Sequence, residues 1–374
     1  MKFSDIPGLA EVKRLLVDAV HTNHSAHAQL FAGAEGAVNL PLALAYATYL
    51  HCENKGDDAC GTCPACLKSA KFIHPDTHFV FPLSNVKNEK DEERLKADIT
   101  KAWRTFLHEQ PFGNLDDWRN FYGGEDKLSI ISKEASRDII RTLSLKPFES
   151  VNKVMIIWRP ETMHVTAANG ILKILEEPTP NTYFILVTNA ADQLMPTILS
   201  RTQMVTVPLL NDDELREYLN EKYPGDSDAI ERTVQLADGN IHRALRLIGQ
   251  GQDNNTGFFA EWMRACFGHR YAALVAMADQ YHALDKVSQR NVISYSLNVM
   301  RETLLFQAGA HGINRTRGEE RDFIEKFSQQ LDIGKIEKSV QLLNDAGYHL
   351  ERNGSAKMIF LDLSLQIAKT LRTS

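Results

Sequence analysis

The stretch that decides the fold is Lys153–Val207, which reads KVMIIWRPETMHVTAANGILKILEEPTPNTYFILVTNAADQLMPTILSRTQMVTV. Three β-branched runs in it are each long enough for a buried strand and too short for a helix: Val154–Ile157, Tyr183–Thr188 and Met204–Val207. A helix is predicted between the first two runs, from about Thr166 to Glu177, because its apolar residues share one face and Pro178 would end it. Strand, helix and strand at this spacing form a parallel crossover unit, so we expect an α/β core.

Short motifs within this stretch are more specific than its pattern of apolar residues. They are Asn169, Leu172-Lys173, Leu175-Glu176-Glu177-Pro178, Thr188-Asn189 and Thr197-Ile198-Leu199-Ser200-Arg201-Thr202. Together they resemble the clamp-loader AAA+ proteins, in which a Ser-Arg-Cys motif carries an arginine that reaches into the ATP site of the next subunit. Here Thr202 stands where the cysteine is usual. The resemblance implies that Arg201 is an arginine finger acting in trans, and the alternative is a surface arginine that binds the last carbonyls of a helix.

Length and composition limit the classes of protein that the chain can represent. Its 374 residues are too many for one ordinary domain and suggest two or three. A hydrophobic content of 43% and a charged content of 24% are typical of a soluble globular protein. The net charge of −6 argues against tight binding of nucleic acid by the chain alone. No apolar run approaches the ~20 residues that cross a bilayer, and no apolar signal region opens the chain, so we expect a cytoplasmic protein without membrane association.

A nucleotide-binding loop is predicted between a short strand, Gln29–Ala32, and a helix from Pro41 to about Leu50. The residues that connect them have the position and length of a P-loop, in which backbone N–H groups and a helix N-terminus hold phosphates. A working P-loop ends in glycine, lysine and serine or threonine, but this one ends in Val38, Asn39 and Leu40. Asn39 carries no charge to oppose phosphate, and Leu40 cannot ligate Mg²⁺.

Two further positions depart from a working ATPase site. The resemblance places an acidic Walker B pair after Val154–Ile157, where this chain has Trp158-Arg159, so no acid there orders Mg²⁺ or polarises water. The stretch that resembles sensor 2 has His242 where an arginine is expected. We therefore expect a structural frame with no intrinsic ATPase and no functional ATP/Mg²⁺ site. The remnant of its phosphate-binding loop consists of Gly33, Gly36 and Asn39.

Four cysteines follow the predicted P-loop helix: Cys52, Cys60, Cys63 and Cys66. Four soft thiolates on a compact loop suit a tetrahedral Zn²⁺, and a site filled entirely by protein ligands would be structural. The clamp-loader family carries a similar four-cysteine insertion at this place. The alternatives are a redox dithiol formed by Cys63 and Cys66, or thiols without a ligand.

The predicted organisation has three parts. An AAA+ α/β core covers 1–208, with a zinc module at 52–66 and an insertion at about 84–127; a small helical lid covers 209–249; and an all-α collar domain covers 258–374. The insertion contains a charged helix over 88–109 with apolar residues on one face. It is either a basic-aromatic surface for DNA or an amphipathic helix packed on the body, and its mixture of acids and bases favours the second interpretation.

The resemblance also implies a function. It indicates a clamp-loader subunit of bacterial DNA polymerase III that does not hydrolyse ATP and works in a hetero-oligomer with the gamma/tau and delta subunits. These subunits load the sliding clamp on primed DNA during replication. One alternative is an active ATPase of the gamma/tau kind, which Asn39, Leu40 and Trp158-Arg159 oppose. The other is a zinc-containing DNA-binding protein, which requires a basic surface that the net charge does not indicate.

Overall fold

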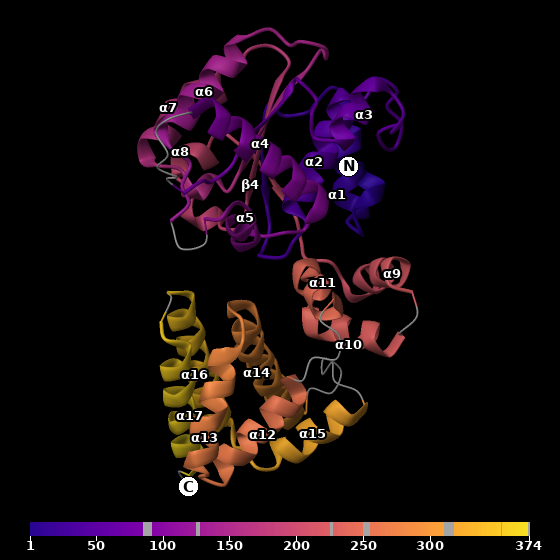
Figure 1. Ribbon diagram of the computed structural model, residues 1–374. Helices are drawn as coiled ribbons and strands as arrows, with labels where there is room; N and C mark the ends of the chain where they lie inside the picture. Colours follow the sequence, from indigo (N-terminus) through magenta and orange to yellow (C-terminus); the bar gives the residue numbers. More distant parts are fainter. Residues whose placement is uncertain are drawn as a thin grey trace. The chain divides into compact units, whose positions relative to one another are not determined.

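The computed structural model describes residues 1–84, 92–124, 128–224, 227–249, 255–309, 318–352 and 354–372. The chain divides into two compact units, Met1–Arg246 and Leu247–Ser374. The first unit contains the parallel sheet, and the described residues of the second unit form helices and their connections (Figure 1). The boundaries between core, lid and collar within these units stay predictions.

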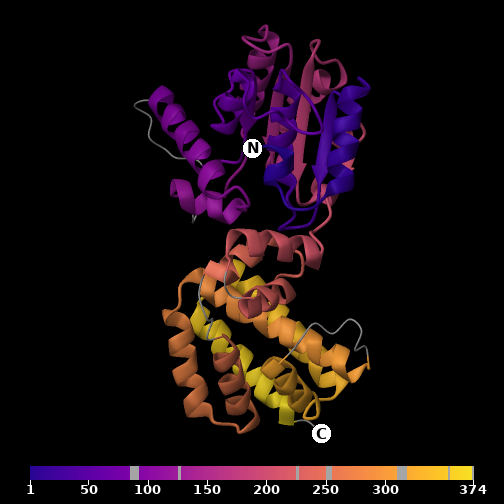
Figure 2. The same cartoon turned by 90° about the vertical axis from the view of Figure 1, so that its right-hand side faces the viewer.

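Five parallel strands form one sheet in the first unit (Figure 2). They are β1 (Ala28–Ala32), β2 (Thr77–Val80), β3 (Lys153–Trp158), β4 (Thr182–Thr188) and β5 (Gln203–Thr206), in the spatial order β2-β3-β4-β1-β5. All residues of β1 and β3 are buried, which explains their continuous apolar sequences. The predicted α/β core is confirmed.

The last strand differs from expectation. The apolar run at Met204–Val207 predicts a buried strand, but β5 lies at an edge of the sheet and pairs only with β1 among the described strands. Its residues are mostly exposed, and Met204 keeps 54% of its surface accessible. The expectation of burial is therefore wrong for β5, because an edge strand can be short and apolar without being covered.

Helices cover both faces of the sheet. On one face α6 (Lys133–Ser144) and α7 (Val165–Glu176) enclose a hydrophobic core, in which Ile171 and Leu175 are completely buried. Burial of such a side chain contributes about 1.5–3 kcal/mol. The other face carries α2 (Asn39–His51), all of whose residues are buried. Because α2 begins at Asn39, the altered end of the predicted P-loop forms the first turn of a buried helix.

The insertion packs against the strand ends with its aromatic side chains. Its helices are α4 (Glu92–Glu109) and α5 (Leu115–Tyr122), and residues 85–91 and 125–127 lie outside the described part of the chain. Trp103 stacks on Phe81 at a ring distance of 4.2 Å, and Trp118 lies edge-on to Trp103 at 5.0 Å. Both tryptophans are buried, so they are not available for stacking on bases. The amphipathic interpretation of the insertion therefore fits the described residues.

Two of the remaining helices, at 64–70 and 196–199, were not predicted from the sequence. In the first unit the remaining helices are α1 (Ala10–His21), α3 (Pro64–Ala70), α8 (Pro196–Leu199), α9 (Asp212–Lys222) and α10 (Ser227–Ala237). Helix α11 (Ile241–Gly249) begins in the first unit and ends in the second. The second unit has α12 (Asn255–Phe267), α13 (Tyr271–Ala283), α14 (Lys286–Gln307), α15 (Gly318–Ser328), α16 (Ile333–Glu351) and α17 (Ala356–Arg372). Residues 250–254, between the predicted lid and the predicted collar domain, lie outside the described part of the chain.

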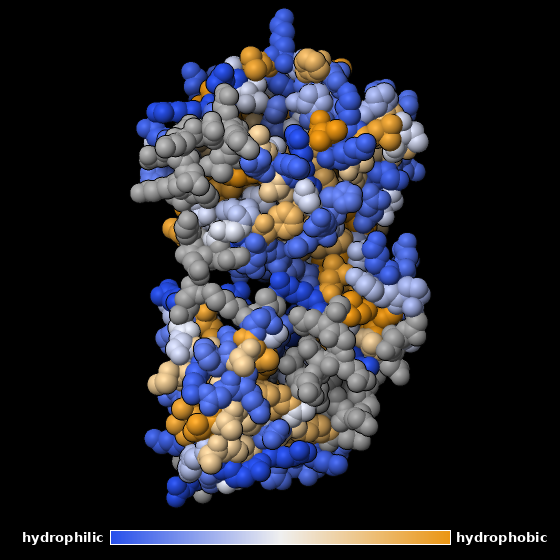
Figure 3. Space-filling model, in the orientation of Figure 1, coloured by the Kyte–Doolittle hydropathy of each residue, from blue (hydrophilic) through white to orange (hydrophobic). Residues whose placement is uncertain are grey.

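The surfaces of both units are largely polar on the face drawn in Figure 3, where hydrophobic residues form small separate patches. In the described ranges, no helix has the length and apolar character needed to cross a membrane. Within the second unit, Trp262 and Tyr281 pack on Phe360 and supply a separate buried core.

Candidate functional site

The loop between β1 and α2 lies at the carboxyl end of a central parallel strand, the edge at which open α/β sheets bind ligands. Both of its glycines are held by close contacts. A Cβ atom on Gly33 would lie 2.3 Å from the carbonyl oxygen of Val207. A Cβ atom on Gly36, whose φ is +86°, would lie 2.0 Å from Cγ of Asn240. Protein atoms therefore pack on the loop at both glycines, and both positions exclude larger residues.

Three asparagine side chains donate hydrogen bonds to this loop and to the end of β4. The donors are the Nδ2 atoms of Asn39, Asn189 and Asn240. Their acceptors, at 2.7–3.4 Å, are the carbonyl oxygens of Gly33, Ala34, Glu35 and Thr188. Asn39, at the position of the P-loop lysine, is 1% exposed and is bound to the backbone. The sequence placed Asn189 and Asn240 in motifs but assigned them no contact with the loop.

At the Walker B position, the side chain of Arg159 binds the same loop. Trp158 ends β3 and packs on Trp103 of the insertion at a ring distance of 5.2 Å. The guanidinium of Arg159 donates to Glu35 of the loop at 2.7 Å, and its other nitrogen lies 3.4 Å from Glu161. A guanidinium here opposes the binding of Mg²⁺, because like charges repel strongly in a partly buried site. The sequence predicted the loss of the acid but not the ion pair that replaces it.

The sensor-2 histidine lies against the insertion. His242 Nε2 is 2.6 Å from Oδ2 of Asp117, and Arg246 forms an ion pair with the other carboxylate oxygen. Burial raises the pKa of the Asp117 carboxyl, but His242, the N–H of Asn114 and Arg246 together hold it below its ordinary value. Asp117 was not among the predicted functional residues, because nothing in the sequence indicated that the insertion contacts α11.

Arg201 lies just after α8 and is bound by its own chain. Its Nη1 atom donates to the carbonyl oxygen of Thr197 at 2.9 Å, and its Nη2 atom pairs with Glu176 at the end of α7. The side chain keeps 29% of its surface exposed. These contacts agree with the helix-end alternative within the isolated chain, and the role of Arg201 as a finger in trans stays a prediction.

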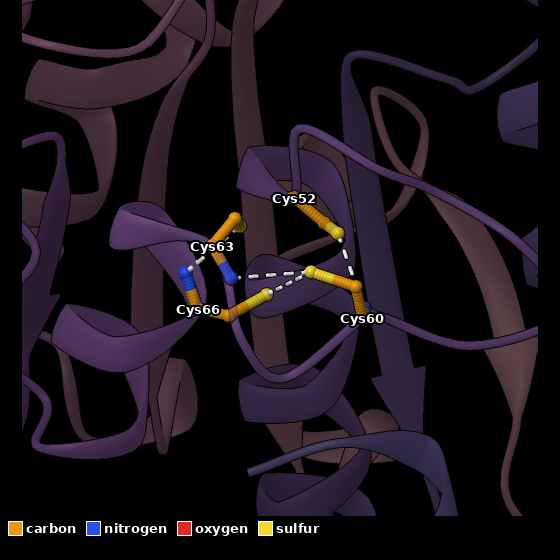
Figure 4. Close-up of side chains that lie close together, drawn as sticks. All are labelled: Cys52, Cys60, Cys63 and Cys66. Atoms are coloured by element: carbon orange, nitrogen blue, oxygen red, sulfur yellow. Dashed lines mark hydrogen bonds between the residues drawn. The ribbon is translucent and has the colours of Figure 1, made fainter.

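The four predicted cysteines converge after α2 and at the start of α3 (Figure 4). All four Sγ atoms lie within 4.8 Å of one another, and those of Cys60 and Cys66 are 3.9 Å apart. In a tetrahedral Zn²⁺ site with Zn–S bonds of about 2.3 Å, the sulfurs are about 3.8 Å apart. No other group of three or more His, Cys, Asp or Glu side chains converges in this way within the described ranges.

Backbone N–H groups are directed at the sulfurs. The N–H groups of Cys60, Cys63 and Cys66 donate to the Sγ atoms of Cys52, Cys60 and Cys63 at 3.2–3.4 Å. Hydrogen bonds from Thr62 and Cys63 lower the pKa of the Cys60 thiol to about 6, whereas burial raises the pKa values of Cys52 and Cys66. All four cysteines are free of disulfides. The arrangement can hold a metal ion as a closed four-thiolate site.

The structure combines an α/β core that has a P-loop-like turn, a four-cysteine module and a helical second unit. These are the features expected from the resemblance to clamp-loader AAA+ proteins. The chain belongs to the family described as DNA polymerase III, delta subunit, whose model matches residues 8–211. The family match thus covers the sheet, the cysteine cluster, the insertion and Arg201.

Individual relatives agree with this assignment. The chain is 27% identical over 250 residues to DNA polymerase III subunit delta' of Pseudomonas aeruginosa, which is 66% of this chain and 63% of that protein. It is 27% identical over 225 residues to subunit delta' of Haemophilus influenzae, 60% of this chain and 56% of that protein. The matched regions thus span less than two thirds of these relatives. A comparison with solved structures finds a gamma-subunit-related protein of Thermotoga maritima, with a TM-score of 0.42 and 14% identity. The match includes 98% of this chain and 100% of that protein.

Proposed function

We propose that this chain is a clamp-loader subunit without ATPase activity, corresponding to the delta' subunit of bacterial DNA polymerase III. It acts in the cytoplasm with the gamma/tau and delta subunits to load the sliding clamp on primed DNA during replication. The family match and the delta' relatives support this proposal. Its membership of a hetero-oligomer explains why a chain with net charge −6 serves a reaction on DNA.

The observation that carries the proposal is the occupation of the predicted P-loop by the chain itself. Asn39 binds the backbone carbonyl of Thr188 at 2.7 Å, and Arg159 binds Glu35 at 2.7 Å. A working site needs a lysine for the phosphates, a hydroxyl for Mg²⁺ and an acid at the Walker B position. None of these groups stands at its expected position, and Asn39 and Arg159, which replace two of them, bind the loop and its neighbours instead.

An active ATPase of the gamma/tau kind is the main competing function. The chain also resembles subunit tau of Bacillus subtilis, at 23% identity over an alignment of 397 positions, gaps included, which covers 100% of this chain and 62% of that protein. Identity at this level does not decide between the two kinds of subunit. The buried Leu40, which lies where a Mg²⁺-binding hydroxyl is required, and Arg159, which repels the metal, favour the subunit that does not hydrolyse ATP.

We propose that the four cysteines hold one structural Zn²⁺. Four thiolates leave no position open for a reactive water, so the metal would stabilise the loop and take no part in catalysis. We propose further that Arg201 serves the ATP site of a neighbouring subunit, exchanging Glu176 for a phosphate oxygen there. The partial exposure of Arg201 supports this role.

Reconstitution with the gamma/tau and delta subunits of the same organism tests the proposal. We expect clamp loading on primed DNA to require this chain. A gamma/tau variant that lacks its own P-loop lysine provides the control, and with it the complete assembly should hydrolyse no ATP. Residual hydrolysis that depends on this chain would favour the gamma/tau-like alternative. Tight, salt-sensitive DNA binding by the lone chain would favour the alternative of a DNA-binding protein.

A further inference from the structure

The helices that follow the sheet, α9 and α11, are joined to the core by several contacts between protein side chains and backbone. The N–H of Leu9 donates to Glu214 of α9 at 2.9 Å. The carboxamide of Asn240, just before α11, donates to the loop carbonyl of Glu35 at 3.1 Å. Between the N-terminal segment, the insertion and these helices lies a cleft of about 1270 Å³. The position of α9 and α11 thus depends on contacts around the rim of this cleft.

A contact with two ionic partners comes from the insertion. Asp117 lies in the first turn of α5 and is 7% exposed. Its two carboxylate oxygens accept from His242 and Arg246, which are four residues apart and therefore lie on one face of α11. A second contact joins the loop before α5 to α9, where the rings of Phe112 and Tyr218 meet edge-on at 5.7 Å.

The insertion can hold α11 in place because the insertion itself is attached to the core. Trp103 and Phe106 pack on Trp158, the residue at the altered Walker B position, at ring distances of 5.2 and 6.3 Å. The indole N–H of Trp118 donates to the carbonyl oxygen of Pro82 at 3.0 Å. A rigid aromatic base therefore connects β3 to the turn that presents Asp117.

We propose that the insertion is a built-in latch that holds α9 and α11 on the core. Its Asp117 presents a carboxylate to two basic side chains of α11, His242 and Arg246, and so it holds α11, and with it α9, on the core. The departures at positions 158 and 242 then have a common purpose, since Trp158 supports the latch and His242 receives it. The latch acts within the single chain, so it is independent of whether the proposed function is correct.

Hydrogen exchange measured by mass spectrometry on the full chain, without nucleotide, tests the latch. Asp117→Ala leaves His242 and Arg246 unpaired, and we expect exchange in α9 and α11 to become about ten-fold faster while β1, β3 and β4 are unchanged. Asp116→Ala is the matched control. It removes an acid from the same turn that pairs with Arg119 inside α5, so α9 and α11 should keep the wild-type rate.

A substitution of Arg246 tests the same contact from its partner on α11. Arg246 is about one third exposed, so Arg246→Gln should fold even if Asp117→Ala does not. It should speed exchange in both α11 and α5, because a latch couples its two partners. The proposal is overturned if Asp117→Ala accelerates α5 alone, or if Arg246→Gln leaves α5 at the wild-type rate, since Asp117 would then serve only as part of the helix cap.

Discussion

Asn39 and Arg159 stand at the positions where the resemblance places catalytic groups, and both bind other parts of the chain. Neither supplies the group that ATP hydrolysis needs at its position, and each forms a contact with the loop or the strand beside it. The exposed end of the Arg159–Glu35 pair is screened by water, so that pair alone contributes about 1 kcal/mol or less. The rigidity of the loop therefore comes from several modest contacts acting together.

A substitution of Gly36 tests whether the close packing of the loop requires glycine at that position. Gly36→Ala should destabilise the chain by roughly 1–3 kcal/mol, because φ is +86° there and a Cβ atom would meet Asn240. Gly56→Ala is the control, since its Cβ atom would meet nothing closer than the carbonyl oxygen of Asp58 at 4.0 Å. Urea unfolding measures both. Equal stability of the Gly36→Ala variant and wild type would contradict the packing that we describe.

Buried histidines make stability depend on pH. Burial lowers the pKa values of His74 and His78, so the unfolded chain binds more protons than the folded chain below about pH 6.5. Stability is therefore fully present above that pH and should fall as the pH drops toward 5.5, by up to about 1.4 kcal/mol per pH unit for each histidine. In urea unfolding at pH 5.5 and 7.5, His78→Thr should lose less stability than wild type. An identical pH dependence of the two proteins would refute this explanation.

At the scale of elements, periodic apolar patterns predicted the fold well. Strands β1, β3 and β4 and helices α2 and α7 lie within two residues of their predicted positions, because burial dictates both their sequence and their structure. Helices α3 and α8 were not predicted. The exposure of β5 could not be predicted, since a short apolar run has the same appearance at the edge and at the centre of a sheet. The contact of Asp117 with His242 joins residues 125 positions apart, and no local pattern encodes such a contact.

The four-cysteine module is the element whose ligand can be tested directly. We expect one Zn²⁺ per chain, and structural zinc in small peptides contributes on the order of 10–16 kcal/mol of binding free energy. Chelation should loosen residues 52–66 and leave the sheet folded, as hydrogen exchange can measure.

Cysteine variants give the matched comparison for that module. Cys63→Ser together with Cys66→Ser should abolish zinc binding, whereas Cys266→Ser, on a helix of the second unit, should retain one zinc per chain. Metal analysis decides between these outcomes. Full zinc content in the double variant would show that the four thiols are not the ligands.

At the scale of the whole molecule, the proposed role of Arg201 in a neighbouring subunit's ATP site can be tested in the assembly. Arg201→Ala should assemble normally and yet reduce the clamp- and DNA-stimulated ATP hydrolysis of a reconstituted loader. Arginine fingers contribute about 10³–10⁵ in rate at a single phosphoryl-transfer site, but only one of several sites would lose its finger, so the total loss should be partial. A variant that assembles normally and matches wild type in both ATP hydrolysis and clamp loading would show that Arg201 only binds its own helix end.

The central claim is that this chain does not bind ATP, because its own side chains bind the loop that would hold the phosphates. An equilibrium titration of the purified full chain with ATP·Mg²⁺ tests that claim most directly. Because the lysine, the hydroxyl and the Walker B acids are all missing, we expect a dissociation constant weaker than about 1 mM, which corresponds to less than about 4 kcal/mol of binding free energy. A micromolar dissociation constant would contradict the account.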